Sequence, residues 1–471
     1  MRAREEATVT QRRTVAPPEA ARAGGGGWYA RHRSDIWVAL IVLLVTAPVV
    51  QYMMAQQESR WALTAAVWDQ RTFSIDDYEH IIGVDRAVKD GHLYSDKAPG
   101  QPLLAVPAYA LYRAVGGEPG TFKREIGNLG LWWVSLWTVA IPAAMLAVLM
   151  RRFAAQASPR WATAAALSLA LGTLLLPFST VLFAHVLSAL CGLGAFLAVQ
   201  PRSASPARLA AGGLLAGCAV LAEYTLAMLV VVLGVIVAAR HGRRVVAYLA
   251  GGAPAALALL AYNAVVFGGP LEFSYRYSAG FGEAHAQGIL GVRLPDPEML
   301  ARITFGERGL FLLTPVVLAG VAGGVLLARR RSTELRFVGT VGLLVFGLFL
   351  LIQAGWSNAT GGASPGPRYV VPGLPFLAAG VAAAYERKPL LVGVASVIGV
   401  LTMGLATFTL PLAQPTERFA LGHWIWRVGE GRIMDTLLTM RLGDWTILAQ
   451  VVLAAGLAAW LLVTERRFTT S

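Results

Sequence analysis

Long apolar runs recur along this chain, and they constrain its fold more than any other feature. With 56% hydrophobic and 14% charged residues over 471 positions, the chain is too apolar for a soluble protein of several domains. Many of the runs are long enough to cross a bilayer as a helix. We therefore predict an all-α polytopic membrane protein with about twelve transmembrane helices, at about 36–54, 128–150, 161–177, 180–199, 209–222, 224–239, 245–267, 310–328, 338–354, 370–385, 390–411 and 446–464.

Arginine and lysine clusters fall in every second connection between these runs, and this alternation predicts the orientation. Such clusters mark the cytoplasmic side of a membrane protein. We expect a disordered basic tail at 1–35, a transmembrane domain at 36–464 that begins with an uncleaved span, and a short tail at 465–471. Both termini are then cytoplasmic in a multi-pass protein of the plasma (inner) membrane. The net charge of +13 is assigned to membrane lipids and not to nucleic acid.

A long first extracytoplasmic loop, at about 55–127, follows from the same pattern. It contains one further apolar run, at about 101–117, which is short and holds two prolines. If this run spanned the membrane, the basic pair Arg151 and Arg152 would move outside and every later loop would break the charge pattern. We therefore predict that it forms a helix along the outer interface, so that the loop carries juxtamembrane helices.

The stretch DGHLYSDKAPG, at 90–100, gathers acids and cations in this outer loop of an otherwise apolar chain. A carboxylate can take a proton from a hydroxyl, and a cation can hold a phosphate leaving group. Group transfer from a lipid phosphate requires both. The cytoplasmic connections are short and carry no Gly-rich phosphate loop, so we do not expect a nucleotide-driven step.

Several motifs resemble the GT-C membrane glycosyltransferases, and most of all bacterial versions of glycosyltransferase family 39, the branch of protein O-mannosyltransferases and lipid A aminoarabinose transferases. The segments QESRWAL and IDDYEHIIGVDRAVKDGHLYSDKAPGQPLLAVPAYAL are similar to the first outer loop of that branch. Gln57 stands where the first acid of an acidic pair is usual, and Glu58 keeps the second. Later segments that resemble relatives include FSTVLFAHVLSAL, LAEYT and GGASPGPRYVVPGLPFL.

The loop chemistry and this resemblance together imply roles for particular residues. The general base is expected to be Glu58 first, then Asp85, then Asp77. The donor phosphate is assigned to five residues, which are Lys97, Arg368, Arg60, Tyr94 and His92. Further substrate contacts are assigned to Asp96, His185 and Tyr369.

Most of these residues also have simpler structural roles open to them. These are an ion pair of Glu58 with Arg60, a helix N-cap at Asp76 or Asp77, an ion pair of Asp85 with Arg86, contact of Lys97 with lipid headgroups, and a hydrogen bond of His185 to a neighbouring helix. Arg368 is different, because a charge held between Gly and Pro at the mouth of a span needs an anionic partner.

The sequence thus predicts a membrane glycosyltransferase that moves a sugar from a polyprenyl-phosphate donor to a hydroxyl of an extracytoplasmic glycan, lipid or protein. The alternative is a transporter or lipid flippase of envelope precursors, which the number of spans would equally allow. No His or Cys pair has metal-ligand spacing. We therefore predict no cofactor or metal, although the chemistry leaves room for a divalent cation.

Overall fold

The computed structural model describes residues 28–119, 127–288 and 291–469. The chain divides into two compact units, 1–33 and 34–471, and the candidate site lies in the second. The chain is mostly helical, at 71%. Within the described ranges, six helices are long and apolar enough to cross a membrane, or seven if the bent pair Pro297–Leu313 and Val316–Ala328 forms one span. The prediction of a multi-pass membrane protein is therefore confirmed, whereas a count of about twelve spans is not.

The apolar runs do become helices, because a backbone in lipid must satisfy its own hydrogen bonds. Several of these helices are broken or shorter than a bilayer is thick, which accounts for the lower count of spans. The helices of the bundle are α1 (Trp28–Thr46), α4 (Leu129–Ser135), which continues through η3 (Leu136–Ala140) into α5 (Ile141–Ala154), α6 (Ala162–Gly172), α8 (His185–Val199), α9 (Pro206–Ala222), α10 (Ala227–His241), α11 (Val245–Phe267), α15 (Val316–Ala328), α16 (Thr333–Ala354), the 3₁₀ helix η8 (Arg368–Leu377) with α17 (Ala378–Arg387), α18 (Pro389–Thr409) and α21 (Trp445–Thr469).

The two ends of the predicted transmembrane domain differ from the structure. Helix α1 begins within the predicted tail, whose residues 1–27 lie outside the described part of the chain, and it ends at Thr46 instead of continuing to 54. Pro48 follows, and proline disfavours helix both at its own position and at the residue before it. The next residues form strand β1 (Val49–Val50), which pairs with β4 (Asp435–Thr436). At the other end, α21 continues to Thr469, past the predicted end at 464.

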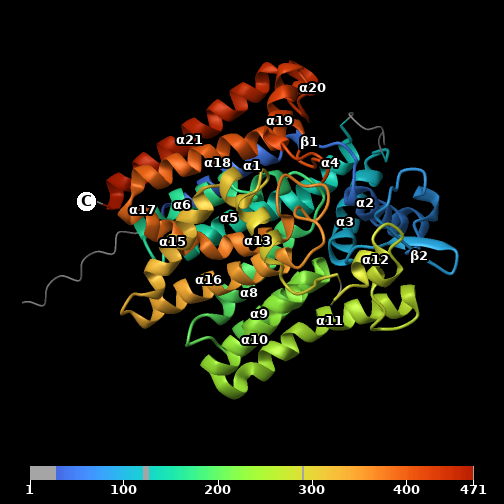
Figure 1. Cartoon of the computed structure of the whole chain (residues 1–471), viewed down its shortest axis with the longest axis horizontal. Helices are drawn as coiled ribbons and strands as arrows, with labels where there is room; N and C mark the ends of the chain where they lie inside the picture. Colours follow the sequence, from blue (N-terminus) through green and yellow to red (C-terminus); the bar gives the residue numbers. More distant parts are fainter. Residues whose placement is uncertain (1–27, 120–126, 289–290, 470–471) are drawn as a thin grey trace, which may run out of the picture. The chain divides into compact units, whose positions relative to one another are not determined.

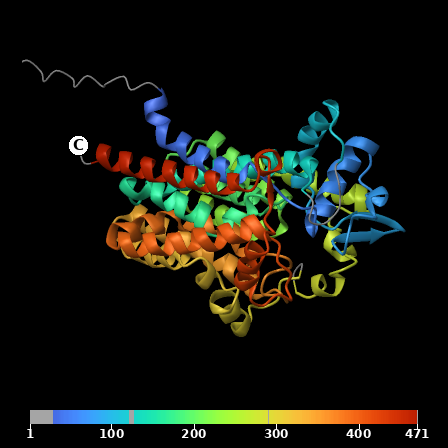
Figure 2. The same ribbon diagram turned by 90° about the horizontal axis from the view of Figure 1, so that it is seen from above.

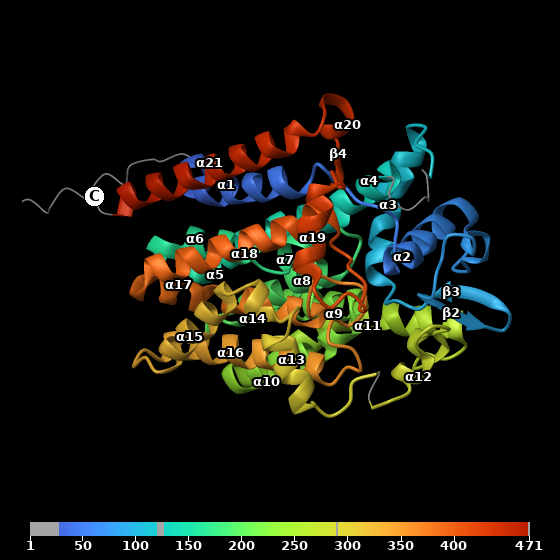
Figure 3. The same cartoon turned by 45° about the horizontal axis from the view of Figure 1, so that its top comes forward.

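The segment 55–127 contains helices, while its position outside the membrane stays a prediction. Helix α2 (Gln56–Ala65) is buried along its whole length and packs against α3 (Gly100–Ala114), which corresponds to the predicted interfacial helix. Between them lies a hairpin of β2 (Arg86–Lys89) and β3 (His92–Ser95). Figures 1 and 3 show α2, α3 and β2 at one end of the bundle with α12 (Gly282–His285), and Figure 2 shows the C-terminal end of α21 at the other.

Helices α9 and α11 pack with their backbones in close contact. A Cβ at Gly213 would come within 1.8 Å of the Tyr248 carbonyl oxygen, and one at Gly251 would come within 2.0 Å of the Ala210 carbonyl oxygen. Small residues allow such contact between membrane helices. The packing fixes the end of α9, where Glu223 follows as the C-cap residue.

Candidate active site

A cavity of about 460 Å³ lies where the segment 55–127 meets the helix bundle. Its lining comes from segments that are distant in the sequence: the start of α2, residues 83–85, the start of α8, and the loops near 281–285 and 356–369. It contains three carboxylates and three cations, namely Glu58, Asp85, Glu223, Arg60, Lys97 and Arg368. His185 and Tyr369 line it as well, so most of the predicted site residues share one cavity.

Glu58 and Gln57 are adjacent at the start of α2, but their side chains have different surroundings. Glu58 lies in the first turn, where the partial positive charge of a helix N-terminus favours a carboxylate, and its Oε2 accepts a hydrogen bond from the Gly83 amide at 3.0 Å. Gln57 turns away from the cavity. Its side chain donates to the Tyr52 carbonyl and accepts from the Leu182 amide, both at 2.9 Å. An ionised acid at position 57 could not make the first of these bonds.

Lys97 lies between two carboxylates. Its Nζ is 2.7 Å from Asp85 Oδ1 and 3.0 Å from Asp96 Oδ2, and all three side chains are largely buried. Burial disfavours the charged form of Asp85, but the Lys97 ammonium, with Arg368 and Arg60 beyond it, outweighs that cost and lowers the pKa of Asp85. For Asp96, burial prevails and raises the pKa. The Lys97 charge is thus already balanced within the protein.

The β2–β3 hairpin explains how DGHLYSDKAPG delivers these residues. Asp90 and Gly91 form its two-residue turn with φ values of 52° and 84°, and Asp-Gly is a preferred sequence for turns with two positive φ values. The following strand brings Asp96 and Lys97 to the cavity. Asp96 lies behind the cavity wall, where its Oδ2 accepts a hydrogen bond from Ser278 at 3.1 Å. It therefore positions Lys97 and does not itself line the cavity.

Arg60 and Arg368 are buried cations with unused hydrogen-bond capacity. Their side chains have exposures of 1% and 8%. Arg60 Nε and Nη2 donate to Gln56 Oε1, and Arg368 has only two contacts at 3.5 Å, to the Ala363 carbonyl and the Tyr369 hydroxyl. Among the described residues, neither Arg60 Nη1 nor Arg368 Nε has a hydrogen-bond partner. Buried donors normally find partners, so this part of the cavity suits an anion.

The loop around Arg368 is shaped to hold its guanidinium. Gly361 and Gly362 have φ values of 75° and 120°, which side chains rarely adopt. A Cβ at Gly362 would lie 2.9 Å from Arg368 Nη1. The two glycines therefore let the backbone close around the cation.

The structure adds site residues to which sequence reasoning assigned no role. Glu223 Oε2 lies 3.8 Å from Arg60 Nη2 and 3.7 Å from His185 Nδ1. Its position between two apolar runs is the signal that could have revealed it. Three further rings, Tyr275, His285 and Trp356, join the predicted Tyr369 in an aromatic wall of the cavity.

The rings of this aromatic wall contact one another. Tyr369 stacks on Trp356 with centroids 4.6 Å apart, and Tyr275 stacks on His285 at 4.1 Å. Burial, together with the nearby Lys97 charge, lowers the pKa of His285 to about 4. The imidazole is therefore neutral at neutral pH, and it acts as a ring in the wall.

Three predicted residues lie elsewhere. Asp77, His92 and Tyr94 line a separate, open hollow together with Asp76. Asp76 Oδ2 lies 2.7 Å from His92 Nδ1, and Asp77 Oδ2 accepts a hydrogen bond from Gln70 at 2.7 Å. Asp76 Oδ1 also accepts from the Leu93 amide, so Asp76 ties this part of the loop to the hairpin. The cavity does not bring these three predicted residues together with Glu58.

We predict no metal or cofactor but leave room for a divalent cation, and this stays a prediction. Within the described ranges, no group of three or more His, Cys, Asp or Glu side chains is arranged to hold an ion.

Comparisons with known proteins give fold neighbours alone. No family model matches the chain, and no curated protein does. The solved structures similar to it include ArnT from Cupriavidus metallidurans bound to undecaprenyl phosphate, at 18% identity over 93% of this chain and 77% of that one, with a TM-score of 0.49. The archaeal oligosaccharyltransferase AglB from Archaeoglobus fulgidus, in complex with an inhibitory peptide and a dolichol-phosphate, is 12% identical over 94% of this chain and 56% of its own, with a TM-score of 0.44.

Proposed function

We propose that this protein is an integral membrane glycosyltransferase. It transfers a sugar from a polyprenyl-phosphate donor to a hydroxyl of a glycan, lipid or protein on the extracytoplasmic side. One observation carries the proposal: in a single cavity, the unused guanidinium donors of Arg60 and Arg368 accompany the carboxylates of Glu58 and Asp85. Transfer from a lipid phosphate needs both kinds of group.

The two arginines suit the donor phosphate. A guanidinium offers planar, paired donors that match phosphate oxygens, and its charge is not lost on burial. Arg368 is the better anchor, because its Nε has no partner among the described residues and its two other contacts are long. Lys97 contributes less directly than the sequence predicts, since Asp85 and Asp96 already neutralise it. Its main role is to hold Asp85 in place.

The reaction is a displacement at the anomeric carbon. The acceptor oxygen forms a bond to that carbon while the bond to the phosphate oxygen breaks, and the polyprenyl phosphate leaves with the electron pair. The acceptor proton moves to a carboxylate. Arg60 and Arg368 stabilise the negative charge that develops on the leaving phosphate. The proton and the charge are thereby both accounted for by residues of the cavity.

Glu58 stays the first choice for the base, ahead of Asp85. The Lys97 ammonium lowers the pKa of Asp85, which makes that carboxylate a weaker proton acceptor. Glu58 lines the cavity from the first turn of α2, and its Oε2 accepts a hydrogen bond from the Gly83 amide. The third candidate, Asp77, lies in the separate hollow.

The aromatic wall suits the sugar itself. A pyranose ring has apolar C–H faces, and these pack well on flat rings while its hydroxyls reach polar groups at the edge. Tyr275, Trp356 and Tyr369 supply such surfaces beside His185 and Glu223. The wall therefore gives the sugar a place between the arginines and the carboxylates.

A transporter or flippase is the alternative function. Such a protein is expected to carry charges near the membrane midplane, on broken helices that recur in two related halves. In the described part of the chain, only one helix pair is broken in this way, by a bend of 96°. The ionisable residues gather instead around the ends of helices, which favours an enzyme.

The test is transfer by the purified protein in lipid bilayers. A panel of radiolabelled polyprenyl-phosphate sugars is offered with extracts of envelope glycans, lipids and proteins, and nucleotide sugars serve as the control donors. We expect label to move to an acceptor from a lipid-linked donor only, and not in the Arg368→Ala variant. Lipid translocation without transfer from any donor would overturn the proposal in favour of a flippase.

A further inference from the structure

A second hollow, of about 370 Å³, adjoins the candidate active site. Asn358 and Pro415 line both cavities, so the two share a wall. The second hollow lies between α13 (Pro297–Phe305), the segment 306–308 and the segment 415–418. None of its charged residues belongs to the motifs discussed so far.

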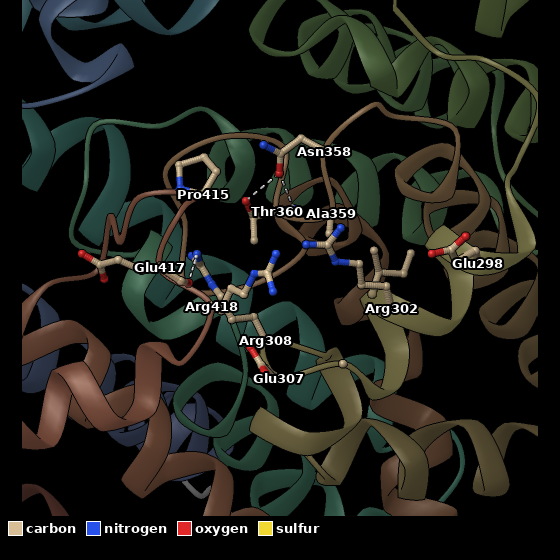
Figure 4. A pocket seen from close by; sticks show the side chains of 12 residues that line it. Glu298, Arg302, Glu307, Arg308, Asn358, Ala359, Thr360, Pro415, Glu417 and Arg418 are labelled. Atoms are coloured by element: carbon tan, nitrogen blue, oxygen red, sulfur yellow. Dashed lines mark hydrogen bonds between the residues drawn. The ribbon is translucent and has the colours of Figure 1, made fainter.

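Three arginines from these segments face this hollow. They are Arg302, in the last turn of α13, Arg308 and Arg418. Figure 4 shows their side chains extending into the same space beside Asn358 and Thr360. Three glutamates, Glu298, Glu307 and Glu417, line the hollow as well, and the carboxylates of Glu298 and Glu417 lie at opposite sides of it in the same view.

Arg308 has a structural role, and the other two do not share it. Arg308 is buried and donates to the carbonyls of Pro365, Ala413, Gln414 and Glu417, at distances from 2.7 to 3.3 Å. It thereby fixes the wall between the two cavities. Arg302 and Arg418 are exposed, and among the described residues their side chains have no ion pair or hydrogen bond.

The nearby glutamates do not neutralise these two arginines. No carboxylate of the described residues lies within 4.0 Å of either guanidinium. Glu417 Oε2 instead lies 3.9 Å from His423 Nδ1. The hollow therefore presents two uncommitted guanidinium groups at its mouth.

We propose that this hollow binds a phosphoryl group of the acceptor. Arg302 and Arg418 hold the phosphate, and the rest of the acceptor extends past Asn358 and Pro415, so that its hydroxyl reaches Glu58. The proposal rests on the proposed function, because it assumes an acceptor. A phosphoryl group is favoured over a carboxylate because its three outer oxygens accept from two guanidiniums at once, whereas two carboxylate oxygens satisfy one. The phosphate belongs to a lipid headgroup or to a phosphorylated glycan.

The test compares two variants in lipid nanodiscs. The double variant Arg302→Gln/Arg418→Gln removes the two free charges. Arg293→Gln is the matched control, because Arg293 is an exposed arginine shortly before α13 and lines neither cavity. Glycerol phosphate is titrated by calorimetry with saturating polyprenyl phosphate present, so that Arg368 is already occupied. We expect the double variant to bind glycerol phosphate at least about tenfold more weakly than both the wild type and the control.

A parallel titration separates the two sources of the phosphate. Nanodiscs that contain phosphatidic acid are compared with nanodiscs of phosphatidylcholine alone. If phosphatidic acid displaces glycerol phosphate in the wild type but not in the double variant, the site accepts a lipid headgroup. If it displaces nothing while glycerol phosphate still binds, the site takes the phosphate of a soluble glycan.

Failure of this inference is distinguishable from failure of the proposed function. Binding of the radiolabelled lipid donor should be the same in all three proteins, because neither Arg302 nor Arg418 lines the first cavity. Equal binding of glycerol phosphate in the wild type, the control and the double variant would overturn the second site, whatever the transfer assay gives. Selective loss of that binding, with no transfer in any protein, would support the site and overturn the glycosyltransferase.

Discussion

The segment 55–127 contains two acid–base pairs that are equally short but differ in their exposure to solvent. His92 Nδ1 and Asp76 Oδ2 lie 2.7 Å apart, with side-chain exposures of 60% and 40%. Lys97 Nζ and Asp85 Oδ1 also lie 2.7 Å apart, with exposures of 8% and 13%. The basic partner of each pair, His92 or Lys97, comes from the same stretch at 90–100. Only the buried pair lines the candidate active site, and the exposed pair lines the separate hollow, so two basic residues five positions apart have different surroundings.

Exposed and buried ion pairs also differ in what they contribute to the free energy of unfolding. An exposed ion pair contributes about 0 to 1 kcal/mol, because water and salt screen it. A buried pair gains little net stability, but removing one partner costs roughly 3 to 5 kcal/mol, because the other charge is left unpaired. Asp85, Asp96 and Lys97 are therefore a costly arrangement for stability alone. A reacting group that must be held in place accounts for it better.

The first prediction sets the acid of the buried site against an acid of the exposed hollow. Glu58→Gln keeps the size and hydrogen bonding of the side chain but removes its basicity, so turnover should fall by roughly 10² to 10⁴ with donor binding nearly intact. The matched change Asp77→Asn should leave turnover within about twofold, because Asp77 lies outside the cavity. Turnover and donor affinity are measured with the radiolabelled lipid-linked sugar.

A different ranking of the turnover of the three variants would identify another base or another site. If Asp85→Asn costs much more turnover than Glu58→Gln, the base is Asp85 and the lowered pKa is part of its tuning. If Asp77→Asn has the largest effect of the three, the exposed hollow is the site, and the distinction by burial is wrong.

The second prediction compares the cations. Arg368→Ala should weaken donor binding by roughly 10- to 150-fold, since a charge-assisted contact contributes about 1.5 to 3 kcal/mol. Arg368→Lys should restore little of it, because an ammonium lacks the planar fork. Isothermal titration with the lipid-phosphate donor measures both. Donor affinity equal to the wild type in Arg368→Ala would remove this residue from the phosphate site.

Lys97→Ala should behave differently from both Arg368→Ala and the exposed His92→Ala. It leaves Asp85 and Asp96 buried without their cation, so it should lower the thermal unfolding midpoint as well as donor binding. His92→Ala should change neither by much, because its pair with Asp76 is exposed. A Lys97→Ala protein with wild-type stability would show that the buried pair is not what holds this region.

Much of the fold was predictable, because lipid leaves a long apolar run few alternatives to a helix. The grouping of Glu58, Asp85, Lys97 and Arg368 was predicted from the loop chemistry and the family resemblance, and the cavity contains all four. The number of spans was not predictable in the same way. The breaks between short helices depend on packing that composition does not record, whereas Pro48 is a local signal that the prediction overlooked.

The other cavity residues could not be predicted, because segments that are distant in the sequence bring them together. Glu223, Tyr275 and Trp356 come from segments whose meeting is decided by helix packing, so no local pattern identifies them. The exposure of His92 was missed because the hairpin was not predicted. Successive side chains of a strand point to opposite faces, which places His92 and Tyr94 at the open hollow while Ser95 is buried.

The last prediction, with the smallest expected effect, concerns the pH dependence of stability. It compares His285 in the cavity wall with the exposed His92. Burial and the Lys97 charge lower the pKa of His285 to about 4 in the folded protein, against about 6.5 in an unfolded chain. Between these values the unfolded state binds a proton that the folded state does not. The stabilisation is therefore complete above about pH 6.5, and it is lost as the pH falls toward 4.

Thermal unfolding of the purified protein between pH 7.5 and 4.5, followed by tryptophan fluorescence, measures this loss. The midpoint should fall by a few degrees in the wild type and by less in His285→Phe, which keeps a ring against Tyr275 but has no group to protonate. His92→Gln should follow the wild type, because the change leaves His285 in place. If His285→Phe kept the full pH dependence of the wild type, the loss would have to come from other groups, and the neutral imidazole would no longer distinguish the cavity wall from the exposed hollow.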